Sequence, residues 1–421
     1  MRRQLFQYFV SVVVTAIALA CSLPATVAAS DAEAAAQLSR RVASHVKTGE
    51  PLRVVCFGDS VTGVYYHTGS RRAYTDMLGL ALQQVFPTGL IEMTNAGISG
   101  HTTVNALKRI DQDVLAKKPH VVTVMFGLND MTRVSLDDYR SNLRTIVEKC
   151  RSIGADVVLA TPNNVITTSS RPVEKLIQYC DVVREVAAEV HAPLCDCYRD
   201  MEAARSRDAF QWRLLMSDPI HPNMAGHKVI AESLARSITG KQVSLSEVEP
   251  PQPATPKLLS LVKSGQPIRI LAMTPFDRMI GPAIQSVAPQ AKVDVTPWSP
   301  EGMTLPELEK DAAAKVRAMK PNLVLIAVPR SAVAANDESF VKSYAWIMNY
   351  SLSFAAQQWD CVVIHPSVAS PGSDSTEKDA LVRQLVGAQD LSLIDRSQGD
   401  DSTSEVILSR FLEQQYKAFG R

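Results

Sequence analysis

Short apolar runs alternate with amphipathic stretches along the first half of the chain. After a polar, alanine-rich helical segment that begins near residue 31, the runs are LRVVCF (52–57), LIEMTNAG (90–97), HVVTVMFG (120–127), DVVLATP (156–162) and APLCDC (192–197). Between the first two runs, apolar side chains recur at helical spacing and form one face: Tyr74, Met77, Leu78, Ala81, Leu82 and Val85. Short buried strands separated by helices predict a three-layer α/β/α sandwich around a parallel sheet.

The same order of runs recurs after a proline-rich segment. SEVEPPQPATPK (246–257) has four prolines within seven residues and no apolar periodicity, so it predicts an extended linker. Beyond it, three earlier segments have an echo: TGEPLRVVCF (48–57) in SGQPIRILAM (264–273), KPHVVTVMFGLND (118–130) in KPNLVLIAVPRSA (320–332), and DVVLATP (156–162) in DCVVIHP (360–366). This repetition predicts a duplicated fold, with domains at 31–240 and 266–421 joined by a linker at 241–265.

The composition of the chain allows two hydrophobic cores, and its charge balance argues against a nucleic-acid partner. The 421 residues are 46% hydrophobic and 21% charged, which suffices for two cores of roughly 150–200 residues each. The 44 basic and 43 acidic side chains give a formal charge of +1, without the basic excess that nucleic acid or an anionic membrane surface attracts. We therefore expect no nucleic-acid partner.

The N-terminus predicts export. Residues 1–30 combine two arginines, an apolar core from about Phe9 to Ala20 and a run of small residues, as a signal peptide does. No later segment reaches the roughly 18–20 apolar residues that cross a bilayer. We expect a periplasmic or secreted protein without an integral membrane segment in the mature chain. The alternative is a lipid anchor at Cys21, although ALAC lacks the usual aliphatic residue three positions before the cysteine.

Six cysteines follow the predicted signal: Cys56, Cys150, Cys180, Cys195, Cys197 and Cys361. An even number in an oxidising compartment permits disulfides, but Cys56 lies in a predicted buried strand and no neighbour of Cys195 and Cys197 has metal-site spacing. We interpret most of the six as small buried hydrophobic residues and expect no metal.

Four polar blocks follow the strands of the first half. They are Gly58-Asp59-Ser60, NAGISGHTT (95–103), Gly127-Leu128-Asn129-Asp130 and SDPIHPNMAGH (217–227). Ligands of open parallel sheets bind beyond the carboxyl ends of the strands, where these blocks fall. Ser60 alone could be an ordinary turn residue and Asn129 alone a helix cap. The four blocks in this order argue for catalysis instead.

Together the blocks make residues 50–240 resemble the SGNH hydrolases, or GDSL esterases and lipases, whose fold is a flavodoxin-like sandwich. The resemblance implies that Ser60 is the nucleophile, that His221 is its base, and that Asp218 orients His221. It also implies an oxyanion hole formed by the N–H of Ser60, the N–H of Gly100 and the side-chain amide of Asn129. Val61 replaces the leucine of the family motif, and another apolar side chain leaves the chemistry unchanged.

The residue types suit this chemistry without the family name. A serine hydroxyl needs a base, and an imidazole titrates near neutral pH. Asp218 and His221 are three residues apart, so one turn can present both side chains on the same side. Donors fixed in advance stabilise the negative oxygen of a tetrahedral intermediate. This mechanism needs no metal or cofactor.

The loop GVYYHTGSRRAY (63–74) follows the nucleophile and contains candidate substrate contacts. We select Tyr65, Tyr66, His67 and Arg71 from it, and His101 from the second block. The two histidines can equally be hydrogen-bonded loop residues, and the two tyrosines can simply pack. Tyrosine and arginine beside a polar site suit a sugar ring better than an acyl tail.

The second half does not repeat the chemistry. Phe276 stands where the first half has Ser60, Ser331 replaces Asn129, and His365 is the only histidine after residue 240. We expect this half to keep the sandwich without the activity, and either to cover or shape the cleft of the first half, to bind a ligand, or merely to pack.

The leading hypothesis is an exported serine esterase that acts on small acyl esters, with an O-acetylated carbohydrate as the favoured substrate. The alternatives are an arylesterase, a thioesterase or a lysophospholipase, and a protein that binds glycans or the cell envelope without turnover. The sequence leaves the oligomeric state, the export route and the acyl group open.

Overall fold

The computed structural model describes residues 25–355, 357–370 and 377–419. The first half contains a parallel five-stranded sheet in the order β2-β1-β3-β4-β5. Its strands are β1 (Leu52–Gly58), β2 (Ile91–Gly97), β3 (Val121–Met125), β4 (Asp156–Ala160) and β5 (Leu194–Cys195). All five predicted strands are therefore confirmed, although the fifth has only two residues.

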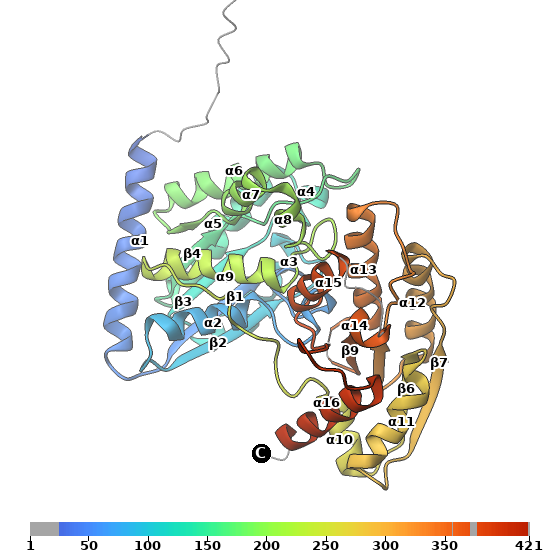
Figure 1. Ribbon diagram of the computed structural model, residues 1–421. Helices are drawn as coiled ribbons and strands as arrows, with labels where there is room; N and C mark the ends of the chain where they lie inside the picture. The colour runs from blue at the N-terminus through green and yellow to red at the C-terminus, as the bar shows by residue number, and fades with distance from the viewer. Residues whose placement is uncertain (1–24, 356, 371–376, 420–421) are drawn as a thin grey trace, which may run out of the picture.

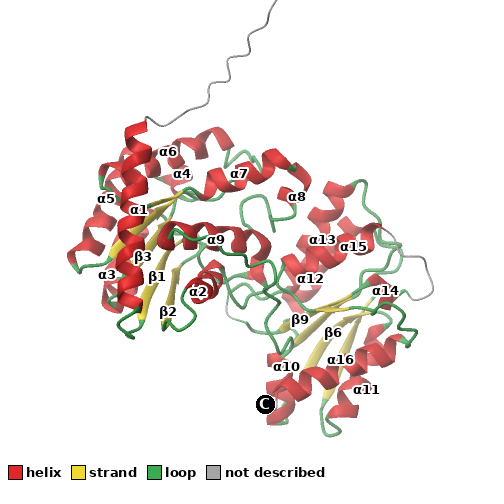
Figure 2. Cartoon of the chain, turned by 60° about the vertical axis from the view of Figure 1, so that its left-hand side comes forward, coloured by secondary structure: helices red, strands yellow, loops and turns green. Residues whose placement is uncertain are grey.

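Helices cover both faces of this sheet. On one face lie α1 (Ala25–Val46), α2 (Tyr74–Val85) and α9 (Met224–Thr239), and on the other α3 (Thr103–Asp113), α5 (Leu136–Ser152) and α6 (Val173–Glu189) (Figure 2). The shorter helices are η1 (Tyr66–Thr68), η2 (Leu115–Lys117), α4 (Asp130–Arg133), α7 (Cys197–Arg207) and α8 (Ala209–Arg213). We call this layered unit the first sandwich. β1 and β3 are almost wholly buried, as expected of strands covered on both faces.

A second parallel sheet follows in the order β10-β9-β8-β6-β7. Its strands are β6 (Ile268–Met273), β7 (Val293–Trp298), β8 (Leu323–Ile326), β9 (Asp360–Ile364) and β10 (Leu393–Ile394). Read from its other edge, this order places β7, β6, β8, β9 and β10 where the first sheet has β2, β1, β3, β4 and β5. The predicted duplication of the α/β fold is confirmed at the level of topology.

The helices of the second half repeat the arrangement of the first, and we call this unit the second sandwich. α10 (Pro256–Ser264), α11 (Phe276–Val287) and α16 (Ser404–Phe419) pack together, as α1, α2 and α9 do. α12 (Leu305–Met319) packs on α13 (Asp337–Ser351), with α14 (Pro366–Ala369) and α15 (Glu377–Ala388) later in the chain. Each sandwich has its own apolar core.

The prediction of a linker through residue 265 is wrong for its last part, because α10 occupies residues 256–264. Pro256 is the first helical residue, where a missing N–H costs nothing. The Asp360 carboxylate at the start of β9 accepts the N–H groups of Lys257 (3.3 Å) and Leu258 (2.7 Å). Burial raises the pKa of Asp360 to about 7. These bonds join α10 to the second sheet.

The two sandwiches lie side by side, with α13 and α15 of the second facing the first (Figure 1). An ion pair joins them, since Arg72 Nε lies 2.7 Å from Asp390 Oδ2 and both side chains are largely buried. A second ion pair joins the buried Arg213 to the exposed Glu338 (2.7 Å). The second sandwich therefore has a defined position beside the loops that follow β1.

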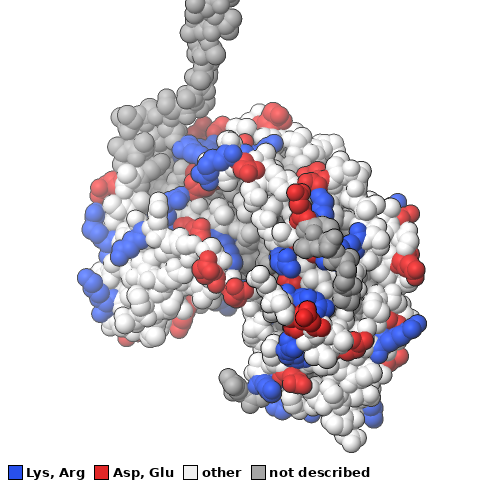
Figure 3. Space-filling model, viewed as in Figure 1, with Lys and Arg blue, Asp and Glu red and all other residues white. Residues whose placement is uncertain are grey.

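The structure also bears on the predictions for the cysteines, the membrane and the surface charge. The six cysteines from Cys56 onward are free and buried, as expected. No helix among the described residues is long and apolar enough to span a membrane. Basic and acidic side chains are interspersed on the face drawn in Figure 3. The predicted signal peptide lies outside the described residues up to residue 24, as does Cys21, and α1 begins at Ala25.

Candidate active site

Ser60 lies two residues beyond the carboxyl end of β1, between the ends of the neighbouring strands β2 and β3. The chain turns sharply here, and Gly63 N–H donates to the carbonyl oxygen of Asp59 (3.0 Å). Gly58 is needed because a Cβ there would lie 2.6 Å from the carbonyl oxygen of Met125 on β3. The close packing of β1 on β3 therefore fixes where the Ser60 side chain emerges.

The structure brings Ser60, His221 and Asp218 into one hydrogen-bonded chain. Ser60 Oγ lies 2.9 Å from His221 Nε2, and His221 Nδ1 lies 2.7 Å from Asp218 Oδ2. Ser60 is 7% exposed and Asp218 5%. With the carboxylate on one ring nitrogen and the hydroxyl on the other, the imidazole can take the hydroxyl proton while its tautomer stays fixed.

The turn before α9 is shaped by Asp218 itself. Its Oδ1 accepts the backbone N–H groups of Ile220 and His221, both at 2.8 Å, so its Oδ2 remains for the imidazole. A further bond runs from Ser217 N–H to the carbonyl oxygen of His221 (2.9 Å). The Asp-x-x-His spacing thus forms a closed turn that presents both side chains together.

The charge of Asp218 is maintained at this site. Burial opposes ionisation of the carboxyl group, but the charge of His221 and its hydrogen bond outweigh that effect. The pKa of Asp218 is therefore held well below its usual range. Asp218 consequently stays ionised at any pH at which an imidazole can act as a base.

The two backbone donors of the predicted oxyanion hole follow the neighbouring strands β1 and β2. Among the described residues, neither the N–H of Ser60 nor that of Gly100 has a hydrogen-bond acceptor. Gly100 has φ +76°, a left-handed conformation that glycine adopts without strain. Both groups are able to donate to an oxyanion.

Asn129 ends the loop after β3 and is 6% exposed. Its Nδ2 donates to Asp59 Oδ2 (3.2 Å) and to the carbonyl oxygen of His101 (3.1 Å), while its Oδ1 accepts from Arg171 Nη2 (3.3 Å). The orientation of the amide is therefore set on both sides. Both Nδ2 hydrogens are engaged in this structure, so donation to a developing oxyanion requires one of these two bonds to be shared or replaced.

Two of these partners have roles that the sequence did not predict. Asp59 belongs to the Gly58-Asp59-Ser60 block, and its Oδ1 also accepts the N–H of Val61 (3.0 Å). Burial raises the pKa of Asp59 to about 6. Arg171 lies in the loop before α6 and bonds the carbonyl oxygen of Leu128 (3.0 Å). No motif marks this arginine, because its role depends on loop packing alone.

His67 lies against His221, the predicted base. Its ring stacks on His221 with centroids 3.7 Å apart, and it is 4% exposed. Burial, and then the charge of His221, lowers the pKa of His67 well below its ordinary value. His67 is therefore neutral and puts no second positive charge against a protonated His221.

His67, Asp218 and His221 also form a group of possible metal ligands among the described residues, with ligand atoms within 4.8 Å of one another. His221 Nδ1 already shares a proton with Asp218 at 2.7 Å. An ion at this position would replace that proton and remove the bond that orients the imidazole. The donor set therefore fits a catalytic triad better than a metal site.

The other predicted substrate contacts differ in their surroundings. Tyr66 lies beside His67 with ring centroids 4.1 Å apart, and Tyr65 Oη accepts the N–H of Ser99 (2.7 Å) next to Gly100. The His101 ring accepts a bond from Arg109 Nε (3.1 Å). Arg71 donates instead to the carbonyl oxygens of Pro251 and Pro253 at 2.8 and 2.9 Å. Both acceptors belong to the predicted linker, and contact of Arg71 with substrate stays a prediction.

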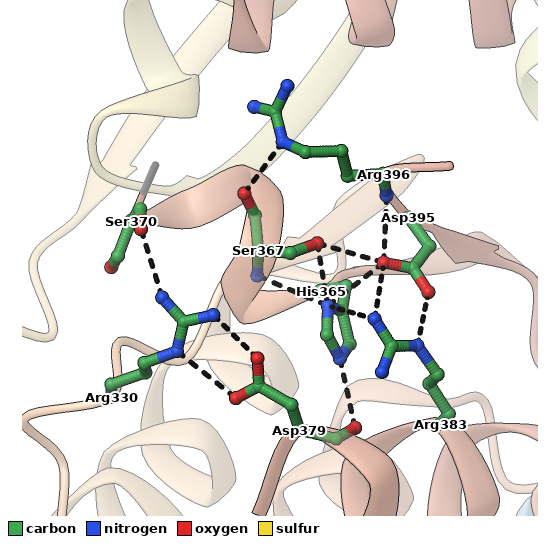
Figure 4. Close-up of polar contacts among 8 residues, drawn as sticks. All are labelled: Arg330, His365, Ser367, Ser370, Asp379, Arg383, Asp395 and Arg396. Atoms are coloured by element: carbon green, nitrogen blue, oxygen red, sulfur yellow. Dashed lines mark hydrogen bonds and ion pairs between the residues drawn. The ribbon is translucent and has the colours of Figure 1, made fainter. Parts of the chain in front are cut away.

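The corresponding edge of the second sandwich has a different polar network (Figure 4). His365 Nδ1 lies 2.8 Å from Ser367 Oγ and 2.9 Å from Asp395 Oδ1, whereas Nε2 lies 3.0 Å from the carbonyl oxygen of Asp379. In a catalytic triad the serine and the carboxylate bond opposite ring nitrogens. Here the same nitrogen faces both.

This polar network connects several helices and strands of the second sandwich. His365 follows β9, Ser367 is on α14, Asp379 is on α15 and Asp395 follows β10. Phe276, at the position of Ser60, is fully buried at the start of α11. The lack of esterase activity in this half stays a prediction.

A parallel α/β/α sandwich with a Ser–His–Asp chain at the carboxyl edge of its sheet agrees with the SGNH hydrolases that the four sequence blocks resemble. Residues 56–229 match the model of the GDSL-like Lipase/Acylhydrolase family. The first sandwich is thus a GDSL-type hydrolase unit, and the protein is a carboxylic ester hydrolase.

Named relatives match the same part of the chain. An acetylxylan esterase of Geobacillus stearothermophilus is 28% identical over 46% of this chain and 96% of its own length. An uncharacterized lipoprotein of Bacillus subtilis is 29% identical over 40% of this chain and 80% of its own. An isoamyl acetate-hydrolyzing esterase 1 homolog of Rattus norvegicus is 26% identical over 47% of this chain and 86% of its own.

Solved structures match over a similar range. The crystal structure of the Axe2 acetylxylan esterase from Geobacillus stearothermophilus is 28% identical, covering 46% of this chain and 97% of that chain with a TM-score of 0.39. That of a lipase/acylhydrolase from Enterococcus faecalis is 27% identical, covering 45% and 97% with a TM-score of 0.38.

Proposed function

We propose that the protein is an exported serine esterase that removes short acyl groups, acetyl above all, from carbohydrate. The observation that carries the catalytic part is the chain of two hydrogen bonds, 2.9 Å and 2.7 Å, from Ser60 through His221 to Asp218. We assign nucleophile, base and orienting carboxylate to these three residues in that order.

In the acylation step, Ser60 Oγ attacks the ester carbonyl carbon while His221 Nε2 takes the hydroxyl proton. The N–H groups of Ser60 and Gly100 and the amide of Asn129 stabilise the oxyanion of the tetrahedral intermediate. The intermediate collapses when the C–O bond breaks and His221 returns the proton to the departing alcohol. Water then attacks the acyl-serine by the same route and releases the carboxylic acid.

The surroundings of the triad support a polar substrate. Tyr65 and Tyr66 are partly exposed next to the triad, and their rings combine an apolar face with a polar edge as a sugar-binding site requires. A long acyl tail would need a larger apolar lining. One relative bears the name acetylxylan esterase, which agrees with an acetylated glycan as substrate.

The predicted signal peptide at residues 1–30 supports a periplasmic or secreted location. A glycan ester outside the cytoplasm is a substrate that such a location makes accessible. A lipid anchor at Cys21 would keep the same enzyme at the membrane surface, and one relative is a lipoprotein.

Chain-length preference tests the proposal. The wild-type protein should hydrolyse p-nitrophenyl acetate at least about tenfold faster, in kcat/KM, than p-nitrophenyl octanoate, because a small polar site cannot bury the six additional carbons of the octanoyl chain. Release should be measured beside Ser60→Ala, which corrects for uncatalysed hydrolysis. Preference for octanoate would point to lipid or thioester substrates. No Ser60-dependent release from either ester would contradict the proposal.

A further inference from the structure

The second sandwich places three aromatic side chains beside the catalytic residues of the first. Phe354 contacts Tyr65 and Tyr66 with ring centroids 5.2 and 5.8 Å apart. Trp346 lies 6.2 Å from Tyr66 and stacks on Tyr350 at 4.9 Å. We call these five residues the aromatic patch. They come from two regions of the chain about 280 residues apart in sequence.

The aromatic patch is continuous with the catalytic groups. Tyr66 lies against His67, and His67 stacks on His221. Tyr65, on the other side, accepts the N–H of Ser99, the residue before the proposed oxyanion donor Gly100. Phe354 contacts both tyrosines, so it is linked to His221 through Tyr66 and His67, and to the loop of Gly100 through Tyr65.

The segment that carries the second-sandwich rings is bonded to the first sandwich at two points. Asn349 Oδ1 accepts from Ser217 Oγ (3.1 Å), the residue before Asp218, and from Gln389 Nε2 (2.6 Å). Gln389 Nε2 also donates to the carbonyl oxygen of Tyr66 (2.8 Å). The Ser70 hydroxyl donates to the carbonyl oxygen of Ser353, next to Phe354. These bonds hold the rings in place relative to the triad.

The rings are nevertheless exposed enough to bind a ligand. Phe354 is 53% exposed, and the other four members of the patch are partly exposed. A cluster that served only to join the sandwiches would gain most by burying these faces completely. Three members are tyrosines, so hydroxyl groups lie at the edge of an apolar surface. This pattern matches a sugar ring, which has an apolar C–H face and a polar rim.

We propose that the aromatic patch is the carbohydrate subsite of the esterase, with Trp346, Tyr350 and Phe354 supplied by the second sandwich. A sugar ring stacks on the patch while its acyl group reaches Ser60. The inference rests on the proposed function, since it assumes that esters are cleaved at Ser60. It also gives the second sandwich a role in substrate selection without chemistry of its own.

Two acetate esters with different alcohols test this subsite. Tetra-O-acetyl-xylopyranose carries a sugar ring, whereas vinyl acetate has the same acyl group and no ring. Both reactions are followed by acid release in a pH-stat. Phe354→Ala and Trp346→Ala should each lower kcat/KM for the sugar ester roughly tenfold, mainly through KM, because a stacked ring contact is lost. For vinyl acetate, kcat/KM should change less than about twofold.

Two further variants control for disturbance of the fold. Phe354→Tyr keeps a ring and should retain wild-type kcat/KM on the sugar ester. Tyr416→Ala removes an aromatic side chain that is 45% exposed on α16. It should leave kcat/KM unchanged for both substrates.

The outcomes separate this inference from the proposed function. Unchanged sugar-ester kinetics in Phe354→Ala and Trp346→Ala would overturn the subsite. Equal losses on both esters would also overturn it, because they would mean that the rings only support the triad. If the wild-type protein hydrolysed vinyl acetate but not the sugar ester, the carbohydrate subsite would be contradicted, whereas the assignment as an esterase would stand. Absence of Ser60-dependent turnover of either ester would overturn both.

Discussion

Replacing His221 with alanine is expected to lower kcat for p-nitrophenyl acetate by about 10⁴–10⁶-fold. His221 Nε2 is the group within 2.9 Å of Ser60 Oγ that can accept its proton. Its neighbour His67 is stacked on the ring face, and burial holds the pKa of His67 well below its ordinary value, so His67 is too weak a base to replace His221. The measurement is steady-state release of p-nitrophenol.

His45→Ala is the matched control for this loss. His45 lies at the end of α1 and bonds the carbonyl oxygen of Pro51, just before β1 and hence at the opposite edge of the sheet from Ser60. It should retain wild-type kcat. Residual activity within tenfold of wild type in folded His221→Ala would remove the assignment of the base.

Asp218→Asn is expected to lower kcat by about 10⁴-fold with the fold intact. The asparagine oxygen can still accept the N–H groups of Ile220 and His221, so the turn is kept. Its amide, however, would donate to His221 Nδ1 and force the ring proton onto Nε2. That nitrogen could then no longer accept the proton of Ser60.

The pH dependence distinguishes this effect from a change in charge alone. The pKa of Asp218 lies well below its usual range, so the wild-type carboxylate stays ionised from pH 5 upward and its protonation does not limit activity there. The Asp218→Asn defect should therefore persist across pH 6–9. The variant should also keep the wild-type circular dichroism spectrum and melting temperature. Recovery of turnover at high pH would contradict the tautomer argument.

The sheets could be predicted from the sequence because burial on both faces leaves a readable signal. β1, β3, β8 and β9 are continuous apolar runs covered by helices. The edge strand β7 was not identified, because Val293–Trp298 is largely exposed and mixes polar with apolar residues. α10 was missed for a different reason, since a proline cluster that predicts a linker also supplies the first residue of a helix.

The triad geometry could be predicted because each residue follows a strand or precedes a helix in a short motif. Asp218 and His221 share one turn, and the parallel sheet brings that turn to Ser60. The contact between Arg71 and the linker could not be predicted, because nothing in the loop sequence indicates that its guanidinium reaches the carbonyl oxygens of Pro251 and Pro253. Contacts between distant segments of the chain leave no local pattern.

The aromatic patch was beyond sequence reasoning for the same reason. Tyr65 and Tyr66 could be selected because they follow Ser60, but Phe354 lies in the second half, which lacks the catalytic blocks. Its place beside them results from the docking of the two sandwiches through Arg72 and Asp390. A long-range arrangement of this kind follows only from the folded structure.

The central claim is that Ser60 is the nucleophile, and labelling with a fluorophosphonate followed by peptide mapping tests it most directly. The wild-type protein should gain one label, on the peptide that contains Ser60, and Ser60→Ala should gain none. Ser367→Ala is the matched control, because Ser367 also lies 2.8 Å from a histidine nitrogen, and it should be labelled as wild type. A label that persists in Ser60→Ala, or a folded wild-type protein that takes no label, would contradict the account.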